Sequence, residues 1–257
     1  MPNLLQIKDL REKYKSNKDV SDKSIKLLTE SFNSRPSDIK AYFQQQSVDP
    51  KIIQYFENQK SSDVVLLFID ITDFSKKCLK MNAVTLSRYL DDYYDIVIPI
   101  IYSHGGEVEK IIGDGIVCLF GEPFLTGAQS TFFQNSESCA KDIIAELKDT
   151  DKEVKIALHE GTIMYYKNKT QNYPEYTMIG QPLTELFRLE SESQNNAINF
   201  YSPTSYDNMH CTSGLNAHPG TNITTAFSSW NKSNPISITL KGVTYSLMKT
   251  LTCTSKI

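Results

Sequence analysis

Two aspartates stand where the fold could bring carboxylates together. Asp70 ends the apolar run VVLLFID (64–70), and Asp114 lies at the centre of the turn Gly113-Asp114-Gly115. We expect the run to be a strand buried on both faces and the turn to close a hairpin beside it. Neighbouring carboxylates repel one another unless a divalent cation neutralises both. The pattern therefore predicts a site for Mg²⁺ or Mn²⁺ at one edge of a sheet, with substrate phosphates as further ligands.

The segment after Asp70 predicts a place for those phosphates. Residues 71–75 (ITDFS) lead from the expected strand into a helix. The first N–H groups of a helix lack partners within the helix and can bind anions. We therefore expect this turn, with Phe74 and Ser75, to contact a triphosphate.

Alternating strand and helix patterns surround these residues. Apolar residues recur at helical spacing between Leu86 and Ile101, and the segment His104-Gly105-Gly106 should end that helix. Further elements are expected as a hairpin around the 113–115 turn, a helix within 132–147, a strand pair over 153–166, a strand at 176–179, a helix over 180–190 and a strand at 197–202. This order predicts an α+β protein with a layered sheet that carries its helices on one face.

Length, charge and composition limit the kind of protein that this chain can be. The 257 residues are enough for one large domain, and a formal net charge of -3 offers no general attraction to nucleic acid or to an anionic membrane. The longest apolar run, 64–69, is far too short to span a bilayer, and no signal peptide is visible, so a cytoplasmic location is expected. The five scattered cysteines are expected to be reduced packing residues.

Three blocks of this sequence resemble the class III nucleotidyl cyclases. FIDITDFS (68–75) is similar to their metal motif, EKIIGDGIVCLFG (109–121) to their hairpin, and YTMIGQPLTELFRLE (176–190) to their third conserved block. The resemblance implies a cyclase catalytic core with a βαββαβ ferredoxin-like sheet over 61–205. Residues 1–60 would then be an N-terminal helical extension and residues 206–257 a C-terminal extension of the same domain.

The resemblance also implies a role for each matched residue. Asp70 and Asp114, with the carbonyl group of Ile71, would hold two divalent cations, Mn²⁺ or Mg²⁺. Arg188 and Thr184 would act on the phosphate in the transition state. The substrate-binding residues would be Phe68, Phe74, Ser75, Lys110, Ile112 and Thr177, with Met178 and Leu183 also beside the base. In this family the metal-binding residues come from one subunit, and the residues that contact the base and the transition state come from the other. The resemblance therefore implies a homodimer that takes an NTP. We expect no nucleic acid and no membrane as partner.

Two residues depart from the family pattern. Thr184 stands where the family has an asparagine, and Thr177 stands where many adenylate cyclases have an aspartate. The first departure leaves two readings open: slower turnover, or a degenerate domain that binds nucleotide as a regulator. A diguanylate cyclase is disfavoured because its GG[D/E]EF hairpin is missing.

The choice of base stays open at the level of residue chemistry. Lys110 only donates and Thr177 both donates and accepts, so adenine, cytosine and uracil all satisfy the pair. The stand-alone organisation and the segment YYDIVIPIIYSHGGEVEKIIGDGIVCLFGEPF resemble the bacterial Pycsar antiphage pyrimidine cyclases. That resemblance implies a pyrimidine cyclase that makes cyclic UMP or cyclic CMP for a separate effector, with cyclic UMP from UTP as the favoured product. An adenylate cyclase making cyclic AMP is the alternative.

Other polar residues are expected to have structural roles. Glu107 and Glu109 are expected to face solvent, because strand alternation separates them from the apolar face. His104 and His159 are expected to serve a helix end and a strand. The tyrosines of the helix over 86–101 are expected to be core residues.

Overall fold

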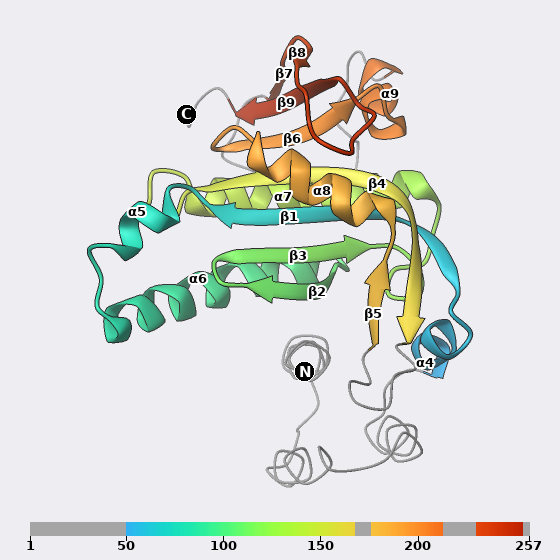
Figure 1. Cartoon of the computed structure of the whole chain (residues 1–257), viewed down its shortest axis with the longest axis horizontal. Helices are drawn as coiled ribbons and strands as arrows, with labels where there is room; N and C mark the ends of the chain where they lie inside the picture. Colours follow the sequence, from blue (N-terminus) through green and yellow to red (C-terminus); the bar gives the residue numbers. More distant parts are fainter. Residues whose placement is uncertain (1–49, 168–175, 213–229, 254–257) are drawn as a thin grey trace, which may run out of the picture.

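The computed structural model describes residues 50–167, 176–212 and 230–253 of the chain (Figure 1). The strands are β1 (Ser61–Ile71), β2 (Glu107–Ile112), β3 (Gly115–Phe120), β4 (Val154–Lys167), β5 (Tyr176–Ile179), β6 (Ala197–Ser202), β7 (Trp230–Lys232), β8 (Ile236–Ser237) and β9 (Leu247–Cys253). The helices are α4 (Pro50–Glu57), α5 (Phe74–Cys78), α6 (Ala83–Ser103), α7 (Gln129–Leu147), α8 (Gln181–Ser191) and α9 (Ser205–Thr212). The short helices expected before residue 50 lie outside the described residues.

Within these ranges the strands form a single sheet in the order β2-β3-β1-β4-β6-β9-β7, with β5 beside β4 and β8 beside β9. The first four strands, with α6 and α7 as the connections, are the predicted βαββαβ ferredoxin-like core, and the α+β class is confirmed. β6 runs parallel to β4, and β9 runs antiparallel to β6. The C-terminal segment therefore continues the same sheet, while the boundary at 205 stays a prediction.

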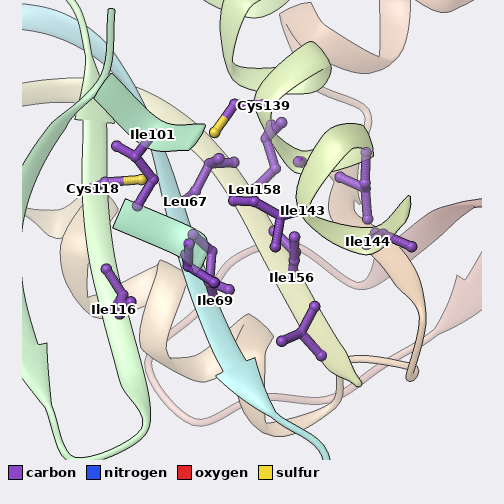
Figure 2. Close-up of a cluster of buried hydrophobic side chains, with 14 of the residues drawn as sticks. Leu67, Ile69, Ile101, Ile116, Cys118, Cys139, Ile143, Ile144, Ile156 and Leu158 are labelled. Carbon is purple, nitrogen blue, oxygen red and sulfur yellow. The ribbon is translucent and has the colours of Figure 1, made fainter. Parts of the chain in front are cut away.

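Helices cover both faces of the sheet, so the expectation of helices on one face was wrong. Alternate residues of β1 feed two apolar clusters: Val65, Leu67 and Ile69 pack with α6 and α7, as Figure 2 shows for Leu67 and Ile69. Val64, Leu66 and Phe68 pack instead with residues of α4 and α8. Because successive side chains of a strand point to opposite faces, an uninterrupted apolar run needs cover on both sides.

The predicted strand pair over 153–166 is a single strand. β4 runs without a turn through Gly161, which lies opposite Val64 of β1. A Cβ atom at Gly161 would lie 2.4 Å from the Cγ atom of Pro182. The glycine therefore serves the close approach of α8 to the sheet and does not make a turn.

Both ends of α6 show ordinary helix-end chemistry. The Asn82 side chain accepts a hydrogen bond from the backbone N–H of Thr85 and caps α6. Gly105, with φ of 76°, takes the left-handed conformation just past the last turn. Of the helices described, none is both long and apolar enough to cross a membrane.

Candidate active site

The structure brings Asp70 and Asp114 together. Ile69 and Ile116 are partners in the antiparallel pairing of β1 with β3, so the end of β1 lies beside the turn that carries Asp114. The two carboxyl groups are within hydrogen-bonding reach of each other. Partial burial and the charge of Asp114 raise the pKa of Asp70 to about 6. Burial also raises the pKa of Asp114, although hydrogen bonds from Asp70 and from the Ile71 backbone oppose this.

A lysine and a third carboxylate complete this cluster, and sequence reasoning missed both. Lys155 is the partner of Asp70 in the β1–β4 pairing, and its Nζ atom lies 3.5 Å from Asp70 Oδ2 and 2.5 Å from Glu190 Oε1. Burial raises the pKa of the Glu190 carboxyl, and the Lys155 ammonium works against that rise. Lys155 therefore links the start of β4, the end of β1 and the last turn of α8.

The donor set fits a hard divalent cation that keeps ligands for a substrate. Burial first, and then the charge of Asp114, raise the pKa of Asp70, and a divalent cation would stabilise both ionised carboxylates. Across the residues described, no three or more histidine, cysteine or acidic side chains are grouped to hold a metal. Asp70, Asp114 and the Ile71 carbonyl oxygen are fewer ligands than a six-coordinate cation takes, so they would leave positions for water or phosphate, as Mg²⁺ sites usually do.

A backbone N–H group of the turn after Asp70 is already hydrogen-bonded within the fold, which the sequence did not predict. The Thr72 N–H donates to the carbonyl oxygen of Glu153 over 2.8 Å, so it is not available to a phosphate. The helix that follows, α5, has five residues, and the Phe74 ring stacks on Tyr89 with centroids 6.2 Å apart. Ser75 is exposed at the start of this helix. Contact of Phe74 and Ser75 with phosphates stays a prediction.

Two of the residues expected to face the base, Lys110 and Thr177, come together around a glutamate. The hydroxyl of Thr177 on β5 donates to Glu109 Oε1 over 3.4 Å, and Lys110 Nζ lies 3.8 Å from the same oxygen. Phe68 is buried, with its ring 4.9 Å from that of Phe187, whereas half of the Ile112 side chain is exposed. Lys110 and Thr177, far apart in the sequence, are therefore neighbours.

The expectation that Glu107 and Glu109 face solvent was wrong. Glu107 is 1% exposed and accepts a hydrogen bond from the Tyr102 hydroxyl, and Glu109 is 5% exposed. The pairing of β2 with β3 shifts register between Val108 and Lys110. Such a bulge adds one residue on one strand and turns side chains away from simple alternation.

Arg188 and Thr184 lie on one exposed face of α8. Their spacing of four residues places them one helical turn apart, with exposed Phe187 beside Arg188. Both side chains face solvent in the single chain. Their role on the phosphate stays a prediction.

The histidines have the predicted structural surroundings. His104 Nε2 lies 2.8 Å from Asp142 Oδ2, just after the end of α6. His159 Nε2 lies 2.9 Å from Glu185 Oε2 in the interior, where burial lowers the pKa of the imidazole. The tyrosines of α6 include Tyr93, which is fully buried.

Comparison with known proteins identifies a matching family and several relatives. A family model described as the adenylate and guanylate cyclase catalytic domain matches residues 56–242. An uncharacterized protein of Mycobacterium tuberculosis (strain ATCC 25618 / H37Rv) is 23% identical over 127 residues, which is 49% of this chain and 22% of the relative. A protein of Mycobacterium bovis matches to the same extent. The matched region is thus less than a quarter of the length of these curated relatives.

Solved structures share the fold. The adenylyl cyclase CyaB from P. aeruginosa superposes with a TM-score of 0.60 at 18% identity, covering 77% of this chain and 97% of that one. The guanylate cyclase domain of RhGC from Catenaria anguillulae, solved with GTP, gives 0.58 at 19% identity, covering 76% and 100%. A dimeric guanylyl cyclase domain from Blastocladiella emersonii gives 0.57 at 16% identity, covering 76% and 98%.

Proposed function

Because the chain belongs to the adenylate and guanylate cyclase catalytic domain family, we propose that it converts an NTP into a 3′,5′-cyclic nucleotide and pyrophosphate. Class III cyclases use divalent metals, Mg²⁺ or Mn²⁺. The observation that carries the proposal is the approach of Asp70 and Asp114, with the pKa of Asp70 raised to about 6. Two ionised carboxylates this close repel each other in the metal-free protein, and a bound cation stabilises both of them.

The reaction is an in-line displacement at the α-phosphorus. The bond from the ribose 3′-oxygen to the α-phosphorus forms, the bond from the α-phosphorus to the oxygen that bridges it to the β-phosphate breaks, and the 3′-hydroxyl proton passes to water. Bound cations supply activation of the attacking oxygen and neutralise the leaving pyrophosphate. Asp70, Asp114 and the Ile71 carbonyl would hold them, Arg188 would stabilise the charge on the α-phosphate, and Thr184 would add one hydroxyl contact.

A homodimer with shared sites is part of this proposal. Arg188 and Thr184 are exposed on α8, while Asp70 at the end of β1 and Asp114 in the turn between β2 and β3 are half-buried. Large apolar side chains are also exposed at Ile112, Ile179 and Phe187. Exposed apolar groups next to predicted substrate-binding residues favour burial by a second copy of the chain. Two copies would then contribute the aspartates and the arginine of each site.

For the substrate we propose UTP, which gives cyclic UMP as a second messenger in bacterial antiphage (Pycsar) defence, with a separate effector and a cytoplasmic location. The support is the sequence resemblance to Pycsar cyclases together with the pairing of Lys110 and Thr177 around Glu109. Lys110 would donate to a uracil carbonyl oxygen. Cyclic AMP formation from ATP is the alternative product. Thr184, with one hydroxyl in place of an amide, favours a degenerate nucleotide-binding regulator as the second candidate function.

One experiment tests these functions together. The purified chain is offered ATP, GTP, CTP and UTP separately with Mn²⁺, and the products are separated by chromatography. We expect pyrophosphate and cyclic UMP from UTP. Cyclic AMP in place of cyclic UMP would refute the pyrimidine assignment, and tight NTP binding without pyrophosphate release would support the regulator instead.

A further inference from the structure

Glu109 lies between the two residues proposed to read the base. Its Oε1 atom accepts the Thr177 hydroxyl over 3.4 Å and lies 3.8 Å from Lys110 Nζ. The Glu109 side chain is 6% exposed, against 32% for that of Lys110. Lys110 can therefore meet a ligand directly, whereas Glu109 reaches it chiefly through its neighbours.

The position of the hydroxyl proton is the central point. A threonine hydroxyl has one proton and two lone pairs, and it can either donate to a base or accept from one. When the Thr177 proton is given to Glu109, only lone pairs remain for a ligand. A carboxylate is ordinarily an acceptor only, so it holds the hydroxyl in this orientation.

We propose that Glu109 is a positioning residue that makes Thr177 an obligatory acceptor and so sets the hydrogen-bond polarity of the base pocket. The inference rests on the proposed function, which places Lys110 and Thr177 against the base. Lys110 supplies a donor and Thr177, through Glu109, supplies an acceptor. In the proposed pose a uracil carbonyl oxygen meets Lys110 and the N3–H group meets Thr177.

This polarity distinguishes two classes of base. Uracil and guanine present a ring N–H beside a carbonyl oxygen, whereas cytosine and adenine present a ring nitrogen acceptor beside an amino group. In the proposed pose, where the ring nitrogen meets Thr177, an acceptor-only Thr177 favours uracil and guanine, because the ring nitrogen of cytosine or adenine would place two acceptors face to face. A buried polar group left without its partner is what gives such sites strong discrimination.

Strand alternation in the sequence does not predict this role of Glu109. Simple alternation assigns Glu109 to the face opposite Lys110, but the register shift between Val108 and Lys110 brings the carboxylate into contact with both Lys110 and Thr177. Figure 1 shows β5, which carries Thr177, near one end of the β2–β3 hairpin. The two segments are far apart in the sequence.

The test measures the ratio of kcat/KM for UTP to that for CTP. Glu109→Met keeps the side-chain length but removes the acceptor, so Thr177 is free to donate, and we expect the ratio to fall at least tenfold. Glu109→Gln keeps an acceptor oxygen and should hold the ratio within about threefold of wild type. Glu107→Met is the matched control, because it changes a buried glutamate on the same strand; its ratio should equal that of wild type.

A double-mutant cycle identifies the route of the effect. If Glu109 acts through Thr177, the change caused by Glu109→Met should disappear in a Thr177→Val background. A wild-type protein without base preference, or a Glu109→Met ratio unchanged from wild type, would overturn the proposal. If Glu109→Met does not fold, the Thr177→Val variant is measured alone, and we expect it to lower the UTP to CTP ratio at least tenfold. An unchanged ratio in Thr177→Val would also refute the proposal.

Failure of the proposed function would be seen separately. A protein that turns over no NTP refutes the cyclase activity but still allows the Glu109 inference to be measured. The same variants are then compared by calorimetric binding of the α,β-methylene analogues of UTP and CTP. We expect the ratio of the two Kd values to follow the pattern given above for kcat/KM, and loss of that pattern would refute the role of Glu109.

Discussion

At the scale of single residues, the charge state of Asp70 connects stability with metal binding. Its pKa is raised from 3.8 to about 6 in the folded protein, by burial first and by Asp114 second. A raised carboxyl pKa means that the stability present below about pH 4 is lost as the pH rises through about 6. Without divalent metal, we expect unfolding free energy to fall by about 2 kcal/mol between pH 4.5 and 7.5, measured by urea denaturation in EDTA.

The variant Asp70→Asn isolates this contribution, because it removes the carboxyl group at almost constant volume. We expect a flatter pH profile than wild type, whereas Asp92→Asn, an exposed change on α6, should retain the wild-type slope. An Asp70→Asn profile as steep as that of wild type would assign the pH dependence to other groups.

Metal binding should reverse the same repulsion. At pH 7.5 we expect added Mn²⁺ to raise the Tm of the wild-type protein, because ligand binding to the native state adds RT ln(1 + [L]/Kd) to stability. Asp70→Asn and Asp114→Asn should show little rise and should lose at least 100-fold in cyclisation rate. Differential scanning calorimetry with a Mn²⁺ titration measures the first effect, and an equal Tm rise in all three proteins would place the metal elsewhere.

At the scale of elements, Lys155 joins α8 to the sheet. Its ammonium lies between Asp70 at the end of β1 and Glu190 in the last turn of α8, and all three side chains are about one-fifth exposed or less. Lys155→Met would leave two acidic groups without their cation, so we expect a loss of about 2–4 kcal/mol in unfolding free energy. Adding Glu190→Gln to this variant should recover part of the loss, and strict additivity of the two changes would argue against the link.

The close contact between β4 and α8 at Gly161 leads to a second prediction about elements. Gly161→Ala puts a methyl group 2.4 Å from the Cγ atom of Pro182, so α8 must shift. We expect a loss of about 1–3 kcal/mol in unfolding free energy together with lower activity, because α8 carries Thr184 and Arg188. Gly242→Ala meets nothing within 4 Å at φ of 78°, and should cost only about 1 kcal/mol of backbone strain without loss of activity.

At the scale of the whole molecule, shared sites predict complementation. Asp70→Ala protein lacks the metal carboxylate and Arg188→Ala protein lacks the arginine, so each homodimer should be inactive. Random exchange makes half of the dimers mixed, and each mixed dimer has one intact site of two, which predicts about a quarter of wild-type activity. Assays after subunit exchange, with exchange verified by a tag on one partner, test this, and proven exchange without recovery would contradict shared sites.

The sequence alone determined the features that depend on local pattern. The apolar run 64–69, the helix spacing between Leu86 and Ile101 and the glycine turn at 113–115 report periodicity and turn chemistry, which act over a few residues. They were sufficient for the α+β class and the meeting of Asp70 with Asp114, and the resemblance to the class III cyclases added the βαββαβ core. The cover of both sheet faces was missed, although the double-sided apolar run already required it.

Only the tertiary structure decided the features that depend on register and on contacts between distant segments. Lys155 meets Asp70 through strand pairing, and Glu190 joins them from another element. The bulge beside Glu109 turns a side chain that alternation assigns to solvent toward Thr177, 68 positions later in the chain. A one-residue shift reverses which face a side chain occupies, and no local pattern in this sequence encodes that shift.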